Sequence, residues 1–316
     1  MSEPKVLQMI DASPSLTAGL KAKFDQSALW EQPDKDAFLA EHGPSFRALV
    51  IVGFSWLIID DSTLSKLPNV EIVASFSAGT NNVNKTVLKS RGVVLTNTGD
   101  VHADTAAELA VGLALSTLRK IVAADRFVRD GKWASGGSFR LTRQVSNKRV
   151  GILGLGLIGA AIARRMTCFG CTIAYCSRSP KPQYPNYMHC NNVVNLAKNC
   201  DILFVSCPLT EDTTKIVNRE VLDALGPEGY VVNVSRGQVI DEAELVSALK
   251  ESRIAGAGLD VFEHEPQVPH ELMQLDNCVL QPHNSSGTME NHEAMANMVV
   301  ANLEAHFAGK PLLSPV

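Results

Sequence analysis

Three glycines in the order Gly154-x-Gly156-x-x-Gly159 stand between a short apolar segment, 150–153, and a run of small residues with helical spacing. A second apolar segment follows at 172–176, so the pattern predicts a strand, a tight turn, a helix and a parallel strand. In such a unit the glycines allow the turn, the approach of a ligand to the backbone and close packing of helix on strand. The helix N-terminus also favours phosphate. The segment predicts a dinucleotide-binding turn, in preference to a purely structural one, with contacts from Gly154, Leu155, Gly156, Leu157, Ile158 and Gly159.

The end of the second strand bears on which dinucleotide is bound. An Asp or Glu about 20 residues after the turn binds the ribose 2′-hydroxyl in NAD-preferring sites. The sequence Ser177-Arg178-Ser179-Pro180-Lys181 has no acidic residue there, and its side chains are suited to bind a 2′-phosphate. Alternatively, Arg178 and Lys181 are ordinary solvated charges. Because the segment follows a dinucleotide turn, it favours NADP(H), with NAD(H) bound at lower affinity.

Composition excludes several classes of function. The 316 residues carry a net charge of −4 and no basic run, so no nucleic-acid partner is expected. No apolar stretch reaches the ~20 residues of a membrane span, and the first residues lack the pattern of a signal peptide. The seven cysteines are scattered, which is typical of reduced thiols in the cytosol. We expect a cytoplasmic protein without a membrane partner.

Strand and helix patterns alternate along the whole chain, which predicts an α/β protein. The first hundred residues read as a small doubly wound unit, with a second strand expected at 28–30. A helix-rich stretch at 103–130 and a polar segment at 131–148 precede six strands of a dinucleotide-binding unit, and a last helix at 286–309 is expected to return to the first unit. The fold class is therefore two doubly wound parallel-sheet domains with a cleft between them, a Rossmann-type cofactor domain and a smaller flavodoxin-like substrate domain. The expected boundaries are 1–99 plus 287–316 for the substrate domain, and 100–286 for the NADP-binding domain, including a dimerisation arm at 103–148.

Three polar segments each follow directly after a predicted strand, at the sheet edge where open parallel sheets bind ligands. The first carries Arg236, which can bind a carboxylate and a carbonyl oxygen together, or can pair on the surface with Asp241 or Glu244. The second, 258–266, holds several carboxylates, which by themselves indicate a solvated loop. The third places His283 after a buried strand and a proline, where alone it is more typical of a core or capping histidine.

Together these segments supply a cation, a carboxylate and an imidazole at the strand ends of one nicotinamide-binding domain. Carbonyl reduction requires an oriented substrate, a hydride from the cofactor and a proton for the alkoxide oxygen. Hydride transfer from a nicotinamide needs no metal, and no His, Cys or Asp cluster has metal-ligand spacing. The sequence therefore favours a reductase without a metal site.

Four motifs occur in order: Gly154-Leu-Gly-Leu-Ile-Gly159, Asn233-Val-Ser-Arg236-Gly237, Leu259-Asp260-Val-Phe-Glu-His-Glu265-Pro266 and Pro282-His283-x-x-Ser286. They resemble the signatures of the D-isomer-specific 2-hydroxyacid dehydrogenases, and the likeness extends over essentially the whole chain. Within this family the chain is most similar to the hydroxyphenylpyruvate reductases of plants, also described as glyoxylate/hydroxypyruvate reductases.

The resemblance implies NADPH-dependent reduction of 2-oxo acids, of the hydroxypyruvate, glyoxylate and 4-hydroxyphenylpyruvate class, to D-2-hydroxy acids. It implies a catalytic triad in which His283 donates the proton, Glu265 fixes the imidazole tautomer and keeps it protonated, and Arg236 orients the keto acid. The backbone amides of Ala78 and Gly79 are expected to bind the substrate carboxylate. The implied substrate contacts are Phe54, Ser77, Ala78, Gly79, Arg236 and His283, and the further cofactor contacts are Cys207, Pro208, Thr213, Val234, Ser235, Asp260, His283 and Ser286.

The chain departs from the family pattern near the substrate and the nicotinamide. Asn81 and Asn84 stand where the family commonly has Asp, and Asn284-Ser285 replaces a small apolar residue and a glycine. These positions bear on selectivity and leave the triad intact.

Two other functions remain open at this point. One is an NAD-linked dehydrogenase of another specificity, and the other is a dinucleotide-dependent binding protein that resembles the C-terminal-binding-protein corepressors. The resemblance and the arm also imply a homodimer. In the arm, Trp133 and Phe139 are expected either to lie in an interface or to pack internally.

Overall fold

The computed structural model describes residues 3–53 and 57–316. The chain forms two compact units, Met1–His102 with Ser286–Val316 (unit 1) and Ala103–Ser285 (unit 2). Both units are parallel α/β layers, which confirms the predicted fold class. The chain passes from one unit to the other after His102 and after Ser285, within a few residues of the boundaries expected after residues 99 and 286.

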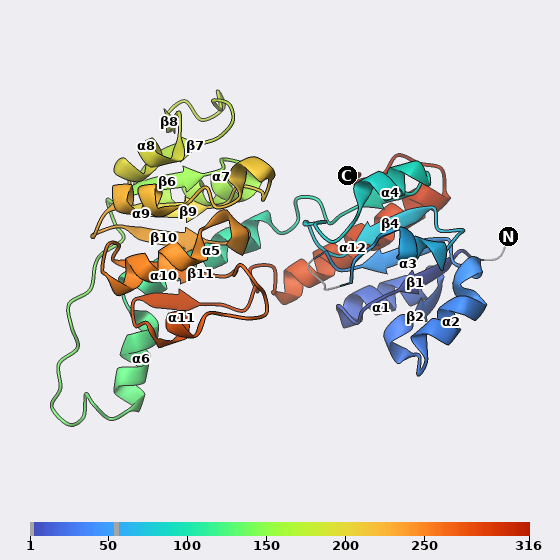
Figure 1. Ribbon diagram of the computed structural model, residues 1–316, viewed down its shortest axis with the longest axis horizontal. Coiled ribbons are helices and arrows are strands. Elements are labelled where there is room, and N and C mark those ends of the chain that lie inside the picture. Colours follow the sequence, from blue (N-terminus) through green and yellow to red (C-terminus); the bar gives the residue numbers. More distant parts are fainter. Residues whose placement is uncertain (1–2, 54–56) are drawn as a thin grey trace. The chain divides into compact units, whose positions relative to one another are not determined.

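Unit 1 is built on a parallel sheet with the strand order β2-β1-β3-β4-β5 (Figure 1). This is the flavodoxin-like order. A second strand is present, but its expected position at 28–30 is wrong. Strand β2 ends at Ala28, and Leu29–Glu31 forms a 3₁₀ turn. The strands are β1 Lys5–Gln8, β2 Asp25–Ala28, β3 Ala48–Ile51, β4 Ile72–Ser75 and β5 Val94–Thr96.

Helices cover both faces of this sheet, so β3 and β4 are buried throughout. Alternate strand residues face α1 and α12 on one side and α2, α3 and α4 on the other. The last helix, α12, thus contributes Met295, Val299 and Leu303 to the core of unit 1. The helices are α1 Pro14–Lys21, α2 Lys35–His42, α3 Asp61–Ser65, α4 Lys85–Ser90 and α12 Met289–Phe307.

Unit 2 is built on a larger parallel sheet with the order β12-β11-β10-β9-β6-β7-β8 (Figure 1). The order reverses between β6 and β9, which makes the end of β6 the switch point where such folds bind dinucleotides. The sequence patterns missed β8, a three-residue strand after a proline-rich loop. The strands are β6 Arg149–Leu153, β7 Thr172–Cys176, β8 Met188–Cys190, β9 Ile202–Val205, β10 Tyr230–Asn233, β11 Gly256–Leu259 and β12 Cys278–Leu280.

Two apolar cores lie on the two faces of this sheet. One joins α5 and α7 to the strands, and the other joins α8, α9, α10 and α11 to the opposite face. Polar caps start several of these helices; Asn218, for example, accepts the N–H of Val221 at the start of α9. The helices are α5 Ala103–Leu118, α6 Ile121–Arg129, α7 Leu157–Thr167, α8 Val193–Lys198, α9 Arg219–Leu225, α10 Glu242–Lys250 and α11 His270–Gln274.

The helix-rich stretch after residue 103 divides into two parts. Helix α5 is embedded in the core, whereas Lys120 adopts a left-handed conformation (φ 52°) and starts the separate helix α6. None of the residues 119–144 is buried. The exposed part of the expected arm is therefore 119–144. Among the residues that the structure describes, no helix has the length and apolar character needed to cross a bilayer.

Candidate active site

The three glycines after β6 each meet a different steric demand. Gly154 has φ +95°, and a Cβ atom there would lie 2.6 Å from the backbone of Cys207. A Cβ at Gly159 would lie 2.2 Å from the carbonyl oxygen of Gly154, so only glycine lets α7 pack this closely. A Cβ at Gly156 would contact no protein atom within 4 Å. The open space above Gly156 fits a pyrophosphate that approaches the backbone.

The start of α7 provides hydrogen-bond donors for such an anion. The N–H groups of Leu157, Ile158 and Gly159 have no acceptor among the described residues, as is usual for the first turn of a helix. These donors and the helix dipole favour negative charge at this point. The predicted cradle therefore has the geometry that a dinucleotide requires.

The loop after β7 presents Arg178 to solvent. The Ser177 hydroxyl donates to the carbonyl of Ser179 at 2.8 Å, and the Lys181 N–H donates to the Tyr175 hydroxyl at 2.7 Å. These bonds order the loop, whereas the Arg178 side chain is exposed and pairs with no residue in the described part of the chain. An exposed guanidinium on a loop ordered in this way is suited to bind a phosphate.

His283 and Glu265 form a direct pair. Nδ1 of His283 lies 2.7 Å from Oε2 of Glu265, and Oε1 of Glu265 accepts the N–H of Phe262 at 3.0 Å. Burial would raise the pKa of Glu265, but the bond to His283, the bond from Phe262 and the charges of His283 and Arg236 together lower it. The carboxylate therefore remains charged and orients the ring through Nδ1.

Asp260 holds the backbone that carries the imidazole. It is fully buried, and its two carboxylate oxygens accept the N–H groups of Asn284 at 2.7 Å and Ser285 at 3.0 Å. The N–H of His283 donates to the Asp260 carbonyl at 2.8 Å, and His283 has the left-handed φ of 51°. Burial raises the pKa of Asp260, and the two backbone donors oppose this. Asn284 and Ser285 both donate a backbone N–H here, and the Ser285 hydroxyl also bonds to Asp260, so the departure from the family pattern preserves the turn.

Arg236 leaves β10 without an acidic partner of its own. Its Nη1 donates to the Ser235 carbonyl at 2.6 Å, and it forms no ion pair with any residue that the structure describes. Asp241 pairs with Lys215 and Glu244 with Arg253, so the alternative of a surface-paired Arg236 is wrong. Burial lowers the pKa of Arg236, and the nearby charge of Glu265 opposes that shift. The remaining guanidinium donors are suited to a carbonyl or carboxylate oxygen.

The loops that carry Arg236 and Glu265 are joined along their backbones. A Cβ at Gly237 would lie 1.9 Å from the carbonyl carbon of Phe262, so glycine permits the two chains to touch. Gln238 donates to the carbonyl of Glu263 at 2.6 Å, and Glu242 accepts the N–H of the same residue at 3.0 Å. The loop with several carboxylates is therefore a built part of the site and not the solvated loop that its composition alone indicates.

In unit 1, the segment Ser77-Ala78-Gly79 after β4 has its carbonyl groups turned back into the protein. The Ser77 carbonyl accepts from Thr98 at 3.2 Å, that of Ala78 from the Asn97 amide at 2.9 Å, and that of Gly79 from the Ser77 hydroxyl at 2.9 Å. The N–H groups of these three residues donate to no acceptor in residues 3–53 or 57–316. Successive amide donors of this kind suit a carboxylate.

The remaining residues predicted to contact the substrate or the cofactor lie in different parts of the chain. Phe54 lies outside the described residues, and Ser286 belongs to unit 1. The Thr213 hydroxyl donates to the Pro208 carbonyl at 2.7 Å, and burial raises the pKa of the Cys207 thiol to about 11. Both residues thus shape the loop after β9. Val234 and Ser235 are buried at the end of β10.

Several residues that hold the site in place were not predicted from the sequence. Asn233 donates to the Arg236 carbonyl at 3.0 Å and accepts the Ser235 N–H at 3.0 Å, which fixes the turn after β10. Gln238 and Glu242 join the two catalytic loops. The only available signal was a polar residue at the end of an apolar strand, because the other contacts join segments far apart in sequence.

Known proteins share this architecture. Residues 111–285 match the family described as D-isomer specific 2-hydroxyacid dehydrogenase, NAD binding domain. The chain is 51% identical to a hydroxyphenylpyruvate reductase from Plectranthus scutellarioides over 311 residues, covering 98% of each chain. It is 49% identical to a glyoxylate/hydroxypyruvate reductase A from Arabidopsis thaliana, again over 98% of each chain.

A solved structure gives the same comparison in three dimensions. It is that of an NADPH-dependent glyoxylate/hydroxypyruvate reductase from Sinorhizobium meliloti in complex with NADP and malonate. The TM-score is 0.92 at 38% sequence identity, covering 100% of this chain and 97% of the other. The likeness therefore extends over both units.

Proposed function

The chain belongs to the D-isomer-specific 2-hydroxyacid dehydrogenase family, and we propose that it is an NADPH-dependent reductase that converts 2-oxo acids to D-2-hydroxy acids. Its substrates belong to the class that the names of its relatives give: hydroxypyruvate, glyoxylate and 4-hydroxyphenylpyruvate. The observation that carries the proposal is the 2.7 Å contact of His283 with Glu265, near the guanidinium of Arg236, which forms no ion pair with any described residue.

Unit 2 is proposed to bind the dinucleotide. The turn at Gly154–Gly159 holds the pyrophosphate, and Arg178 with Ser177, Ser179 and Lys181 holds a 2′-phosphate. NADPH supplies, when bound, the hydride for the substrate carbonyl carbon. The NADP-bound reductase from Sinorhizobium meliloti supports this choice of cofactor. NAD(H) lacks the 2′-phosphate and would bind with lower affinity.

His283 acts as the general acid in reduction. Its Nδ1 is committed to Glu265, so Nε2 is the nitrogen that gives a proton to the developing alkoxide. Glu265 stabilises the protonated ring by its charge, and Asp260 fixes the backbone from which the ring projects. In the reverse direction the same nitrogen takes the proton back.

Arg236 and the Ser77-Ala78-Gly79 segment are proposed to orient the 2-oxo acid. Arg236 binds an oxygen of the substrate through its unused N–H groups, which polarises the carbonyl as charge develops. The amides of Ala78 and Gly79 bind the carboxylate, since their carbonyls already accept hydrogen bonds within unit 1 and their N–H groups have no acceptor among the described residues. Fixing the acid at both ends raises the rate by orientation.

The experiment that tests this function is steady-state kinetics of the purified protein. Glyoxylate, hydroxypyruvate and 4-hydroxyphenylpyruvate are each supplied with NADPH and with NADH, and the chirality of the product is determined. We expect turnover with NADPH, a lower kcat/KM with NADH, and a D-2-hydroxy acid as product. Absence of turnover with every acid and either cofactor would overturn the proposal, and preference for NADH would favour an NAD-linked dehydrogenase.

We also propose that the protein is a homodimer that associates through residues 119–144. Trp133 is 67% exposed and Leu141 97% exposed, and Ile121 and Val128 lie exposed on one side of α6. Phe139 is half-buried against Phe127, with ring centroids 5.5 Å apart. This amount of exposed apolar surface on one segment is typical of an interface.

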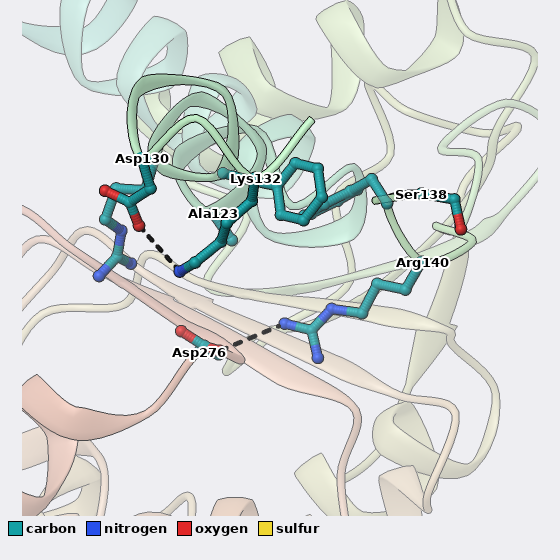
Figure 2. Close-up of a pocket in the computed structure, with 9 residues that line it drawn as sticks. Ala123, Asp130, Lys132, Ser138, Arg140 and Asp276 are labelled. Atoms are coloured by element: carbon teal, nitrogen blue, oxygen red, sulfur yellow. Dashed lines mark hydrogen bonds and ion pairs between the residues drawn. The ribbon is translucent and has the colours of Figure 1, made fainter. Parts of the chain in front are cut away.

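The segment 119–144 has no residue buried in its own chain, which supports the same proposal. A hollow of about 380 Å³ is lined by residues of α6, of the segment that follows it and by Asp276. Figure 2 shows these lining residues and two ion pairs among them, Lys132–Asp130 and Arg140–Asp276. Exposed ion pairs of this kind contribute only about 0–1 kcal/mol each. A second copy of the chain would bury the apolar side chains that the arm leaves in solvent.

We place the protein in the cytosol. Its seven cysteines are all free thiols, which suits a reducing compartment. Accumulation of a fluorescent fusion in an organelle would contradict this placement.

A further inference from the structure

Asn97 connects the carboxylate-binding segment to the end of β5. Its Nδ2 donates to the Ala78 carbonyl at 2.9 Å, and its Oδ1 accepts the N–H of Gly99 at 2.9 Å. The side chain therefore sets the orientation of the peptide between Ala78 and Gly79. The N–H of that peptide belongs to Gly79, one of the two amides proposed to bind the substrate carboxylate.

The backbone of Asn97 is in turn held by Ser314. The N–H of Asn97 donates to the Ser314 carbonyl at 3.2 Å, and the Ser314 hydroxyl donates to the Asn97 carbonyl at 2.6 Å. Before Asn97 on β5, Thr96 bridges to Pro315, and the N–H of Val316 donates to the Leu95 carbonyl at 3.0 Å. The segment 313–316 thus lies along the edge of β5 and ends its pairing at Asn97.

Asn302 on α12 fixes Ser314 from the interior of unit 1. It is fully buried, and its Nδ2 donates to the Ser314 hydroxyl at 2.8 Å and to the Met298 carbonyl at 2.9 Å. Its Oδ1 accepts the N–H groups of Leu313 at 3.0 Å and Ser314 at 3.2 Å. All four hydrogen-bonding positions of this amide are used, so it specifies one arrangement of the segment.

We propose that Asn302 and Ser314 are positioning residues for the substrate carboxylate, acting through Asn97 on the Ala78–Gly79 peptide. This inference rests on the proposed function. The Ser314 hydroxyl is the middle link, because it receives a hydrogen bond from Asn302 and donates one to Asn97. Its removal leaves a donor of Asn302 and the Asn97 carbonyl without their partner and frees the Asn97 backbone to shift.

A positioning role for this network and a purely structural role predict different effects of the same substitution. Loss of general support in unit 1 lowers the melting temperature without a selective effect on one ligand. Displacement of the Gly79 amide weakens binding of the 2-oxo acid and leaves the dinucleotide cradle of unit 2 unaffected. A rise in KM for the 2-oxo acid without a change in the Kd of NADPH therefore indicates the positioning role.

The test compares Ser314→Ala with Ser314→Thr, which keeps a hydroxyl. The matched control is Ser90→Ala, which removes an exposed serine-to-carbonyl bond of 2.9 Å in the same unit. We expect Ser314→Ala to raise KM for hydroxypyruvate roughly three- to tenfold, the effect of one displaced hydrogen bond. The Kd of NADPH should be unchanged, the threonine variant should recover most of the loss, and Ser90→Ala should behave as wild type.

Hydrogen–deuterium exchange of the peptide that contains residues 77–80 gives a readout independent of turnover, and we expect faster exchange in Ser314→Ala only. An unchanged KM in an active enzyme, or unchanged exchange, would overturn the inference while leaving the proposed function intact. If wild type reduces no 2-oxo acid, the proposed function fails first, and the inference fails with it. Should Ser314→Ala not fold, Asn97→Asp replaces it in both measurements. This variant loses the donor to the Ala78 carbonyl and keeps the acceptor for the Gly99 N–H, so we expect the same rise in KM and the same faster exchange.

Discussion

At the residue scale, the chemistry depends on side chains that the backbone holds from several directions. Glu265 receives a backbone N–H on one oxygen and the imidazole on the other, and Asp260 receives two backbone N–H groups behind that imidazole. Each carboxylate therefore has a defined orientation without competing for the same donor. Arg236 differs from them, because it retains donors for a substrate.

Replacing Glu265 by Gln should move the pH profile of reduction toward lower pH. The folded-state pKa of Glu265 lies below its ordinary value, so its charge is present above that range and is lost only as the pH falls through the lowered pKa. Gln lacks this charge at any pH and stabilises the protonated imidazole less. We expect the alkaline limb of kcat/KM to move to lower pH. Glu263→Gln removes a neighbouring carboxylate that pairs with Lys215 and should leave the profile in place; a profile equally unmoved in both variants would disprove the role of Glu265.

Replacing Arg178 by Asp should exchange the cofactor preference. The new carboxylate repels a 2′-phosphate and can accept a ribose hydroxyl, so KM for NADPH should rise roughly ten- to a hundredfold. KM for NADH should change much less. Lys198→Asp, at an exposed position of α8, controls for the change of charge. Equal effects on NADPH and NADH would remove Arg178 from the cofactor site.

At the scale of the element, the strand-to-helix turn was predictable because each glycine is required by its immediate neighbours in the turn or by the ligand next to it. The positions of Arg236 and His283 after apolar strands were predictable for a similar reason, since parallel strands share one edge. The contacts of Gln238 and Glu242 with Glu263 were not, because they join loops that meet only in the folded sheet. Local patterns also missed β8 and the left-handed Lys120 that separates α6 from α5.

In the glycine turn, one substitution should weaken NADPH binding without lowering the melting temperature. Ala at position 156 meets no protein atom, and the φ of −89° there suits any residue, so Gly156→Ala should keep the wild-type melting temperature. Its methyl group occupies the space of the pyrophosphate, so the Kd of NADPH should rise roughly tenfold or more. Gly159→Ala places its Cβ against the Gly154 carbonyl and should lower the melting temperature as well. Tight NADPH binding by Gly156→Ala would show that the pyrophosphate lies elsewhere.

At the scale of the whole molecule, the chain combines two parallel-sheet units of different strand order. The flavodoxin-like order of unit 1 and the Rossmann-type order of unit 2 were both expected, and the family resemblance is confirmed. Each unit contributes amide or guanidinium donors at the carboxyl ends of its strands. Residues 119–144 form the longest run of the described chain in which no residue is buried.

The homodimer predicts that a charge on α6 separates the subunits. Ile121→Asp and Val128→Asp each place a carboxylate in the middle of the proposed interface and should convert a dimer into a monomer of 34.1 kDa. Met273→Asp, at an exposed apolar position of α11, should remain dimeric. Sedimentation or light scattering measures the mass. A monomeric wild type would contradict the proposal.

The most direct test of the account is kcat for hydroxypyruvate with NADPH in His283→Ala, measured together with the Kd of NADPH. The imidazole is proposed to donate the proton and to take no part in the pyrophosphate cradle. We therefore expect kcat to fall about 10²- to 10⁴-fold, the usual contribution of a general acid, with the Kd nearly unchanged. A kcat equal to that of wild type would contradict this assignment, because the proton would then come from a group other than the imidazole.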